Sequence, residues 1–435
     1  MKRNVLRQVL FLLFLSAVIV LVMGFWVITS VKAGTPPANS FPNRFSWAAY
    51  DSDDDSDEDF PGRRLRRQDR WEPEVRYNRV EGLYLGMKLN KDGGRRRYAS
   101  AYTPAIYGFL GNAFATKELQ YQIGLEKGFF EEFRLAFGGE YHRRITTPDL
   151  WIMPEDENSL AAVLIKEDFH DYYFTEGKSG YITQNFTSAL KLTAAYQSED
   201  LRHEDRHANW SLFGGHKVFR ENPLLDEGLL NAMTGRLVID TRNSVRRTAR
   251  GWYIQIEGER AGDSFGGDFK YDRLLADLRR FQPLGFGEGV DLRIRVGTAT
   301  GRLPWEKSFH LGGVSTLRGF PYKAFPNGWA EPGGNRMVLA QLEYRLGRDE
   351  LPDMMDLGLL DNFNLILFTD AGWAATVDST FSPTEGFEGL TIGRLKHDVG
   401  IALANRAGNV RLELARRTDI GDKPYTFWFR ISRPF

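Results

Sequence analysis

The chain has 435 residues, and its 57 basic and 57 acidic side chains give a formal net charge of zero. Without a basic excess, nothing in the composition points to a nucleic-acid partner. The absence of cysteine excludes disulfides, thiolate metal sites, cysteine nucleophiles and a lipid anchor on cysteine. Glycine and aromatic residues are frequent, as the tight turns and aromatic girdles of a membrane β-barrel would require.

The N-terminus has the pattern of a secretory signal. Basic residues precede an apolar run over residues 9–28, and Val31-Lys32-Ala33 follows as a small-residue cleavage site. The run is also long enough to be a retained transmembrane anchor. We expect cleavage, with residues 1–33 as the signal peptide, because the rest of the chain has the pattern of an exported protein.

Residues 34–76 are expected to be a disordered, charged linker. An acidic run from Asp51 to Asp59 is followed by a basic run that begins at Arg63, and blocks of like charge are usually disordered. The acidic run lacks the glycine turn and the spaced ligands of a calcium loop, so a solvated linker is the favoured interpretation.

From residue 77 onward, apolar and polar residues alternate with the period of two that gives a β-strand two different faces. For example, Val290, Leu292 and Ile294 alternate with Asp291 and Arg293. Both charge signs recur on the polar face, as a water-filled lumen allows. We therefore predict an all-β fold, a transmembrane antiparallel β-barrel over residues 77–435. The alternative is a soluble β-sandwich with one solvated face.

The pattern predicts sixteen strands and one helix. The strands lie near residues 79–90, 97–109, 117–127, 131–143, 180–197, 207–215, 229–240, 250–260, 269–281, 289–299, 307–314, 334–347, 362–372, 393–404, 409–417 and 424–434. Residues 158–171 indicate a helix between the fourth and fifth strands. Counting strands from residue 79 places this helix at the periplasmic end of the barrel.

Two of these strands carry an acidic residue on the polar face, and a loop with one arginine precedes them. Glu343 lies in the strand near 334–347, and Asp370 lies in the next strand. If Arg318 folds back from the loop, charge-assisted hydrogen bonds satisfy all three charges. The alternative is an arginine in an ordinary surface turn. The expected role of the arginine is to brace the loop in a barrel that otherwise leaves an aqueous channel.

The residues around this arginine resemble those of a known family. Leu317-Arg318-Gly319-Phe320 is followed by Gly333-Gly334-Asn335, by Leu342-Glu343-Tyr344, and by Phe368, Asp370 and Gly372 at alternate positions. In this order the chain resembles the bacterial surface antigen superfamily, which contains the outer-membrane assembly factors (BamA- and TamA-like barrels) and the two-partner secretion transporters. The resemblance implies a sixteen-stranded barrel in the outer membrane of a Gram-negative-type bacterium, with the Arg318 loop folded into the lumen.

The resemblance extends to both ends of the barrel. Residues 78–83 resemble the first-strand signature of the family, and Phe435 resembles the C-terminal signal that the assembly machinery reads. In the family, the first and last strands pair weakly and part sideways, so this seam would lie between residues 80–89 and 425–432. The seam residues are then Gly82 and Gly86, which have no side chains to pack, and Phe427 and Phe429.

The resemblance also implies a function, the assisted insertion or translocation of proteins or lipids at the outer membrane. The expected partners are outer-membrane lipid, an unfolded outer-membrane protein as client, and a periplasmic partner that supplies docking modules. Family members that assemble or secrete proteins carry such modules ahead of the barrel, and residues 34–76 are too few and too polar to form one. The alternative function is a gated or passive transport pore.

One segment matches a catalytic pattern. Residues 203–207 read His-Glu-Asp-Arg-His, as in H-E-x-x-H zinc proteases, but that motif requires a helix and this segment lies in a polar connection. The sequence has no serine-hydrolase elbow, P-loop or dinucleotide fingerprint. We expect no catalytic residue, no metal and no cofactor, and a barrel enzyme ranks below the two transport hypotheses.

Overall fold

The computed structural model describes residues 71–90, 104–129, 135–244, 248–285, 288–346, 363–405, 408–419 and 425–435. Its strands are β1 (Trp71–Asn78), β2 (Gly82–Leu89), β3 (Ala105–Ala113), β4 (Glu118–Phe129), β5 (Leu135–Thr146), β6 (Tyr173–Asn185), β7 (Leu190–His203), β8 (Gly228–Asp240), β9 (Gly251–Ala261), β10 (Lys270–Gly285), β11 (Glu288–Arg302), β12 (Arg336–Arg345), β13 (Phe363–Ala375), β14 (Lys396–Asn405), β15 (Arg411–Arg417) and β16 (Thr426–Arg430). The helices are α2 (Glu155–Ile165), η1 (Asp263–Phe265) and η2 (Trp305–Lys307). Within these ranges, no helix is long and apolar enough to cross a membrane.

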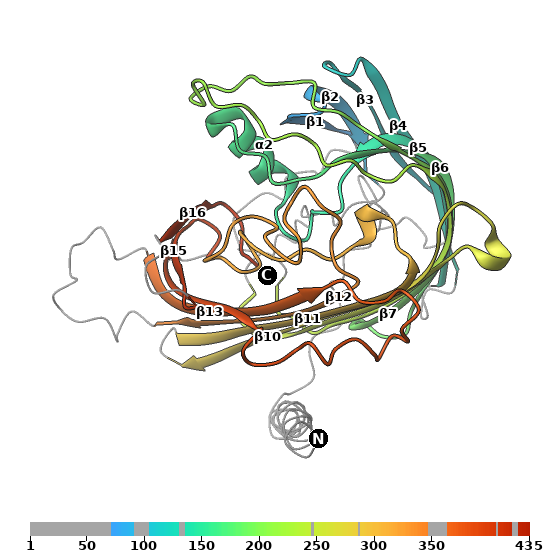
Figure 1. The fold of residues 1–435 in the computed structure, drawn as a ribbon. Helices are drawn as coiled ribbons and strands as arrows, with labels where there is room; N and C mark the ends of the chain where they lie inside the picture. The colour runs from blue at the N-terminus through green and yellow to red at the C-terminus, as the bar shows by residue number, and fades with distance from the viewer. Residues whose placement is uncertain are drawn as a thin grey trace, which may run out of the picture. The chain divides into compact units, whose positions relative to one another are not determined.

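The strands form one sheet in which each strand pairs antiparallel with the next one along the chain. The sheet curves round on itself, and its strand order starts at β1 and ends at β16 (Figure 1). In the described parts of the chain no ladder joins these two strands, and α2 lies at the opening between them (Figure 1). The predicted all-β antiparallel barrel of sixteen strands is confirmed.

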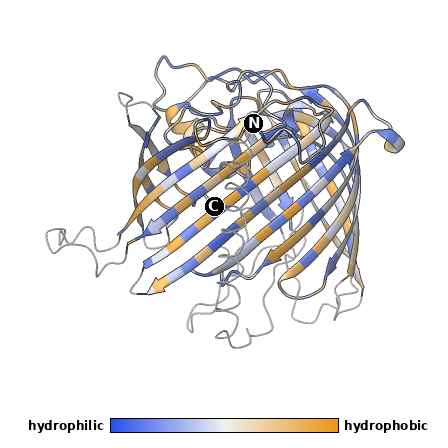
Figure 2. Ribbon diagram, turned by 60° about the horizontal axis from the view of Figure 1, so that its bottom comes forward, coloured by the Kyte–Doolittle hydropathy of each residue, from blue (hydrophilic) through white to orange (hydrophobic). Residues whose placement is uncertain are grey.

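Each strand has one apolar and one polar face, and the apolar faces point outward. Figure 2 shows hydrophobic and hydrophilic residues alternating along the tilted strands. The exposed apolar side chains of the first strands include Leu83, Leu85, Met87, Ile106, Leu110, Leu119, Ile123 and Leu125. Charged residues of the opposite face, such as Asp277 and Arg293, are buried inside. This arrangement suits a barrel with a polar lumen and a lipid-facing surface.

Several predicted strand positions are wrong, although the total is right. Strand β1 (Trp71–Asn78) was missed, because Pro73 and its charged residues gave it the composition of the predicted linker. Strands β6 and β7 were merged into 180–197, because only four residues separate them. Residues 207–215 and 307–314 form no strand. Two missed strands thus offset two false ones. The predicted signal peptide and linker residues 34–70 lie outside the described residues.

Helix α2 begins after Pro154, which is extended, and ends at Lys166 in the left-handed conformation. Its first turn carries Glu155, Asp156 and Glu157, whose charges interact favourably with the helix dipole. Because β1 is an additional first strand, the parity of the chain reverses, and the predicted periplasmic position of this helix is wrong. The helix lies at the end that holds the four longest described connections, 147–172, 204–227, 303–335 and 376–395. In outer-membrane barrels the longer loops lie on the extracellular side, so this end of the barrel, with α2, is the extracellular end.

The main apolar core lies inside the barrel. It joins the β11–β12 connection, residues 303–335, to the inner faces of β10, β11 and β12. Phe309, Leu311, Leu317 and Phe320 of the connection pack against Leu275, Ala299, Met337 and Leu339. This long connection therefore folds into the lumen, as the sequence predicts, and fills space that a barrel of this size would otherwise leave to water.

Glycines on the inner face make room for aromatic rings from the neighbouring strand. Gly124 of β4 lies directly opposite Tyr107 of β3. A Cβ atom at position 124 would lie 2.2 Å from Cζ of Tyr107, which is far closer than van der Waals contact. Gly235 of β8 differs, because a Cβ atom there would meet nothing within 4 Å.

We expect Gly124→Ala to reduce the free energy of unfolding by about 1–3 kcal/mol, because the added methyl group forces the Tyr107 ring out of its place. The measurement is urea unfolding of the protein in lipid vesicles, followed by tryptophan fluorescence. Gly235→Ala is the matched control and should leave the unfolding midpoint unchanged. Equal losses in the two variants would show that the close approach at Gly124 has no energetic role.

Candidate functional site

The centre of the lumen holds a buried arginine bound to acidic residues of two strands. Arg318 lies in the β11–β12 connection and is completely buried. Its Nε and Nη2 donate to the two carboxylate oxygens of Asp370 on β13, at 2.7 and 2.8 Å. Its Nη1 donates to Oε1 of Glu343 on β12, at 2.7 Å. The structure thus brings together the three charged residues that the sequence singled out.

The neighbouring motif residues shape the space around the guanidinium. The Phe368 ring stacks under it, with Cζ of Arg318 3.5 Å from the ring centroid. Gly319 passes so close to β14 and β15 that a Cβ atom would lie 2.7 Å from Cβ of Asp398 and 2.8 Å from a backbone nitrogen. Its own amide donates to Asp398 at 2.9 Å. Glycine is therefore required here for a close approach between backbones. Gly372 leaves room for Leu311 and Leu317, and Phe320 packs in the lumen core.

The network also contains residues that the sequence analysis did not assign to it. Arg411 of β15 donates to Glu343 at 2.8 Å, and its Nε lies 2.9 Å from Glu413. Trp428 of β16 donates to the carbonyl of Arg318 at 2.8 Å. Arg411 and Glu413 are buried on β15, away from its exposed face, but the meeting point of these residues with Arg318 depends on the register of strands that are distant along the chain.

The network is electrostatically balanced in favour of a charged arginine. Burial alone would lower the pKa of the Arg318 guanidinium, but the surrounding carboxylates, with Asp370 foremost, hold this pKa well above its usual range. Charge-assisted, bidentate contacts of this kind are the strong class of hydrogen bonds. The arrangement offers a rigid attachment for a loop, and it presents no nucleophile beside a general base.

A second buried cluster joins three connections at the long-loop end. Lys323 of the β11–β12 connection contacts Asp149 and Asp171 of the β5–β6 connection, at 2.8 and 2.6 Å. Arg220 of the β7–β8 connection contacts Asp171 at 2.5 Å. Burial alone would raise the pKa of the Asp171 carboxyl, but Arg220 and Lys323 hold it well below the usual range. These ion pairs fasten the three connections into one unit above the lumen.

The predicted seam residues lie partly elsewhere. Gly82 and Gly86 belong to β2, because β1 precedes them, so neither glycine lies on the first strand. Gly82 follows the β1–β2 turn and has a positive φ of 62°. The expected first strand near 79–90 is therefore the second strand. Phe427 and Phe429 do lie on β16, and both are more than half exposed on its outer face.

The last residues of the chain turn away from the wall. β16 ends at Arg430, four residues short of the predicted strand end, and the C-terminus lies inside the curved sheet (Figure 1). The carbonyl of Pro434 accepts a hydrogen bond from Arg293 at 3.4 Å, and the Phe435 ring lies 6.5 Å from that of Phe281. A role of Phe435 as an assembly signal stays a prediction.

Comparison with known proteins decides the family. The Omp85 superfamily domain matches residues 160–435, which is more than half of the chain. The chain belongs to the Omp85 superfamily. This places it in the outer membrane of a Gram-negative-type bacterium. Members of the superfamily are assembly and transport barrels rather than enzymes. No curated protein sequence matches the chain.

One solved structure shares the fold of this Omp85 barrel at low sequence identity, and two others have weaker similarity to it. BamA from Haemophilus ducreyi lacking POTRA domains 1-3 has a TM-score of 0.52 and 14% identity, over 83% of this chain and 69% of that chain. CdiB from Acinetobacter baumannii has a TM-score of 0.40 and 12% identity, over 82% of this chain and 58% of that chain. CdiB from Escherichia coli has a TM-score of 0.38 and 11% identity, over 83% of this chain and 61% of that chain. The chain thus spans under two thirds of the CdiB chains.

The segment with the H-E-x-x-H pattern is not helical. His203 is the last residue of β7, and residues 204–207 continue as an irregular connection. Nε2 of His203 lies 3.2 Å from Asp205, within the same segment. The two histidines therefore do not share the helical face that the zinc-protease motif requires.

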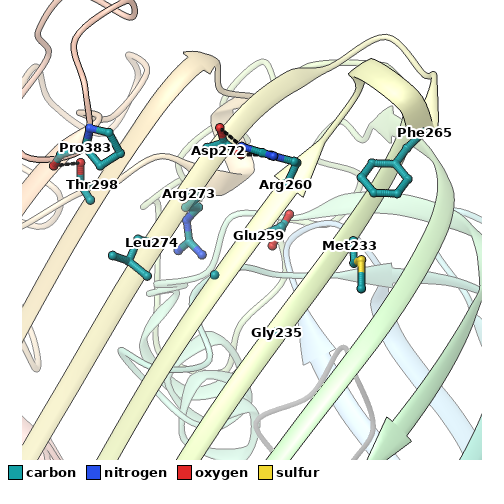
Figure 3. Close-up of a pocket in the computed structure, with 11 residues that line it drawn as sticks. Met233, Gly235, Glu259, Arg260, Phe265, Asp272, Arg273, Leu274, Thr298 and Pro383 are labelled. Carbon is teal, nitrogen blue, oxygen red and sulfur yellow. Dashed lines mark hydrogen bonds and ion pairs between the residues drawn. The ribbon is translucent and has the colours of Figure 1, made fainter.

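A pocket of about 510 Å³ lies at the wall of this Omp85 barrel, lined mainly by residues of β8, β9 and β10 (Figure 3). Met233 and Leu274, which are both about half exposed, form part of its lining. Arg260 and Asp272 form an exposed ion pair beside it, with Nη2 2.9 Å from Oδ2 (Figure 3). The pocket contains no residue of the Arg318 network. Its exposed Arg260–Asp272 ion pair therefore offers a comparison for the buried ion pairs of Arg318.

We expect Arg318→Ala to lower the free energy of unfolding by about 3–5 kcal/mol, because it leaves buried carboxylates without a counter-charge. Urea unfolding in lipid vesicles measures the loss. The matched control is Arg260→Ala, which removes an ion pair that solvent screens and should leave the unfolding midpoint nearly unchanged. A similar effect in both variants would contradict a bracing role for Arg318.

Proposed function

We propose that this Omp85 barrel assists the insertion or translocation of proteins or lipids through the opening between β1 and β16. One observation carries the proposal: within the described residues, the strand order ends at β1 and β16 without a ladder between them. Free strand edges present unpaired backbone groups, which are a template for another extended chain. A wall that is closed elsewhere by ladders is thus interrupted at one place only in the described sheet.

The strands beside this opening are too short for an ordinary membrane wall. β1 and β2 have 8 residues each, β15 has 7 and β16 has 5, whereas β10 and β11 on the other side have 16 and 15. A membrane-spanning strand requires about 9–11 residues. A short apolar wall thins the adjoining bilayer, because lipid adapts to hydrophobic mismatch. Thin lipid beside an open edge favours insertion at this side.

A gated transport pore is the second candidate, and the polar lumen supports it. Asp277 contacts Arg293 and Arg295 on the inner face, both at under 3 Å. Such charges suit a water-filled passage. The Arg318 connection and the two connections joined to it fill this passage in the present arrangement, so conduction would require the Arg318 loop to move.

The proposal includes a periplasmic partner that presents the client. The described residues of this chain are strands of the barrel and their connections, and none forms a separate docking domain. The solved BamA structure that this chain resembles is described as lacking POTRA domains 1-3, so that BamA protein has domains besides its barrel. We infer that an unfolded outer-membrane protein reaches the opening with the help of such a module on another chain, while outer-membrane lipid surrounds the barrel.

The deciding experiment places the purified protein in liposomes and adds an unfolded outer-membrane protein. Client insertion is followed by protease protection, and a trapped dye reports leakage in the same sample. We expect faster insertion than in protein-free liposomes, without dye release, because the lumen is filled and no strand ladder closes the side opening. Dye release without insertion would favour the transport pore.

The pore hypothesis makes its own prediction. Arg318→Ala should raise single-channel conductance in planar bilayers, because the loop loses its attachment to Asp370 and Glu343. Arg260→Ala is the control and should not change it. If Arg318→Ala leaves conductance at the wild-type value, the pore hypothesis loses its gate.

A further inference from the structure

Helix α2 contacts both strands that border the opening. It lies between β1 and β16 in Figure 1, although it belongs to the β5–β6 connection. Side chains from its first two turns reach each of the two strands. No other described helix contacts both edges.

On the β1 side, α2 packs against the edge of the strand and binds one of its backbone amides. The backbone amide of Tyr77 donates to Oγ of Ser159 at 3.2 Å. Nε of Arg76 lies 3.3 Å from Glu155. Ala162 is buried against the Tyr77 side chain. The helix therefore satisfies an edge amide that would otherwise be free to pair with an incoming strand.

On the β16 side, one buried carboxylate holds the point where the chain leaves the wall. Nε of Arg430 donates to Oε1 of Glu157 at 2.5 Å, and Nη2 donates to Oε2 at 3.2 Å. The amide of Ile431 also donates to Glu157, at 3.2 Å, and the hydroxyl of Ser432 donates to the same side chain. Both Glu157 and Arg430 are buried. These contacts fix the turn that directs residues 431–435 into the lumen.

The helix is short, and polar side chains make its contacts with the edge strands. It has 11 residues, and isolated helices shorter than about 12–15 residues are marginal in water. It is held mainly by polar contacts rather than by a broad apolar face. Asn158 binds Asp168 at 2.9 Å and accepts a hydrogen bond from the Phe169 amide at 2.7 Å. These bonds keep the helix attached to its own connection. Asp149 and Asp171 hold that connection to Lys323, so release would break the contacts of α2 with the two edge strands and leave the ion-pair cluster in place.

We propose that α2 is a releasable latch across the opening, with Glu157 and Ser159 as its two fastening residues. Attached, it covers the edge of β1 and holds the end of β16 turned inward. Released, it frees both edges for a client strand. The latch deepens the proposed insertion function and rests on it, because an opening that passes no client needs no latch.

The first test removes one fastening charge and measures exposure of the edge. Glu157→Gln should increase hydrogen exchange by about ten- to hundredfold in peptides that contain Tyr77 and α2, because charge-assisted hydrogen bonds to Arg430 are lost. Asp156→Asn is the matched control, since Asp156 is the exposed neighbour in the same helical turn, and it should leave exchange unchanged. A heat-induced gel shift of each variant verifies that its barrel is folded. Unchanged exchange in a folded Glu157→Gln protein would overturn the latch.

The second test locks and unlocks the helix in one preparation. The chain has no cysteine, so Glu157→Cys with Ser432→Cys can be bridged by a bismaleimide that contains a reducible disulfide. Client insertion into liposomes should stop while the bridge is intact and recover after reduction. Asp156→Cys with Leu160→Cys, bridged within the exposed face of the helix, is the control and should insert client in both states.

The two tests separate the latch from the function. Equal insertion with the bridge intact and reduced would overturn the latch and leave the insertion function in place. If no form inserts client, wild type and unlocked variants included, the insertion function fails, and the exchange measurement alone decides whether α2 is a releasable element.

Discussion

A guanidinium buried among carboxylates is the interaction on which the inside of this barrel depends. Burying the charged Arg318 side chain without partners would cost several kcal/mol. The loop that carries it can therefore enter the lumen only where acidic side chains can pair with it. Asp370 and Glu343 come from two adjacent strands, and Arg411 and Glu413 come from a third. The loop therefore folds in only when these strands stand in register, and the arginine then holds that register. The same ion-pair network therefore places the loop in the lumen and fixes the register of the strands.

The same constraint explains why the outer connections are fastened with ion pairs. Strands with an apolar outer face present a polar inner face, and a loop that packs against such a face cannot rely on apolar contact alone. At the long-loop end the same loop is held by another connection, through Lys323 between Asp149 and Asp171 of the β5–β6 connection. The apolar cluster around Leu317 and Phe320 forms where the inner face carries Met337 and Leu339 instead. Charged and apolar anchors thus alternate along a single connection.

Sequence patterns predicted the features that depend on residues close together along the chain. Alternation predicted most strands, and the meeting of Arg318 with the next two strands follows from strand order and the family motif. Strand β1 escaped because Glu72, Pro73 and Glu74 resemble the charged linker. The place of α2 was unpredictable for a different reason, since its partner Arg430 lies 273 positions away from Glu157. A contact of that kind requires the curvature of the sheet, which no local pattern contains.

The last strand links the filled lumen to the side opening. Trp428 donates to the Arg318 carbonyl, and Arg430 donates to Ser315 of the same connection at 2.8 Å. Such bonds contribute about 1 kcal/mol when neutral and about 1.5–3 kcal/mol when charged. The contacts of Arg318 with its carboxylates are buried, charged and several, so their loss costs more than the loss of either bond to β16. In the proposed opening, the bonds to β16 therefore break before the loop leaves its site. The proposed side opening is therefore compatible with a lumen that stays filled.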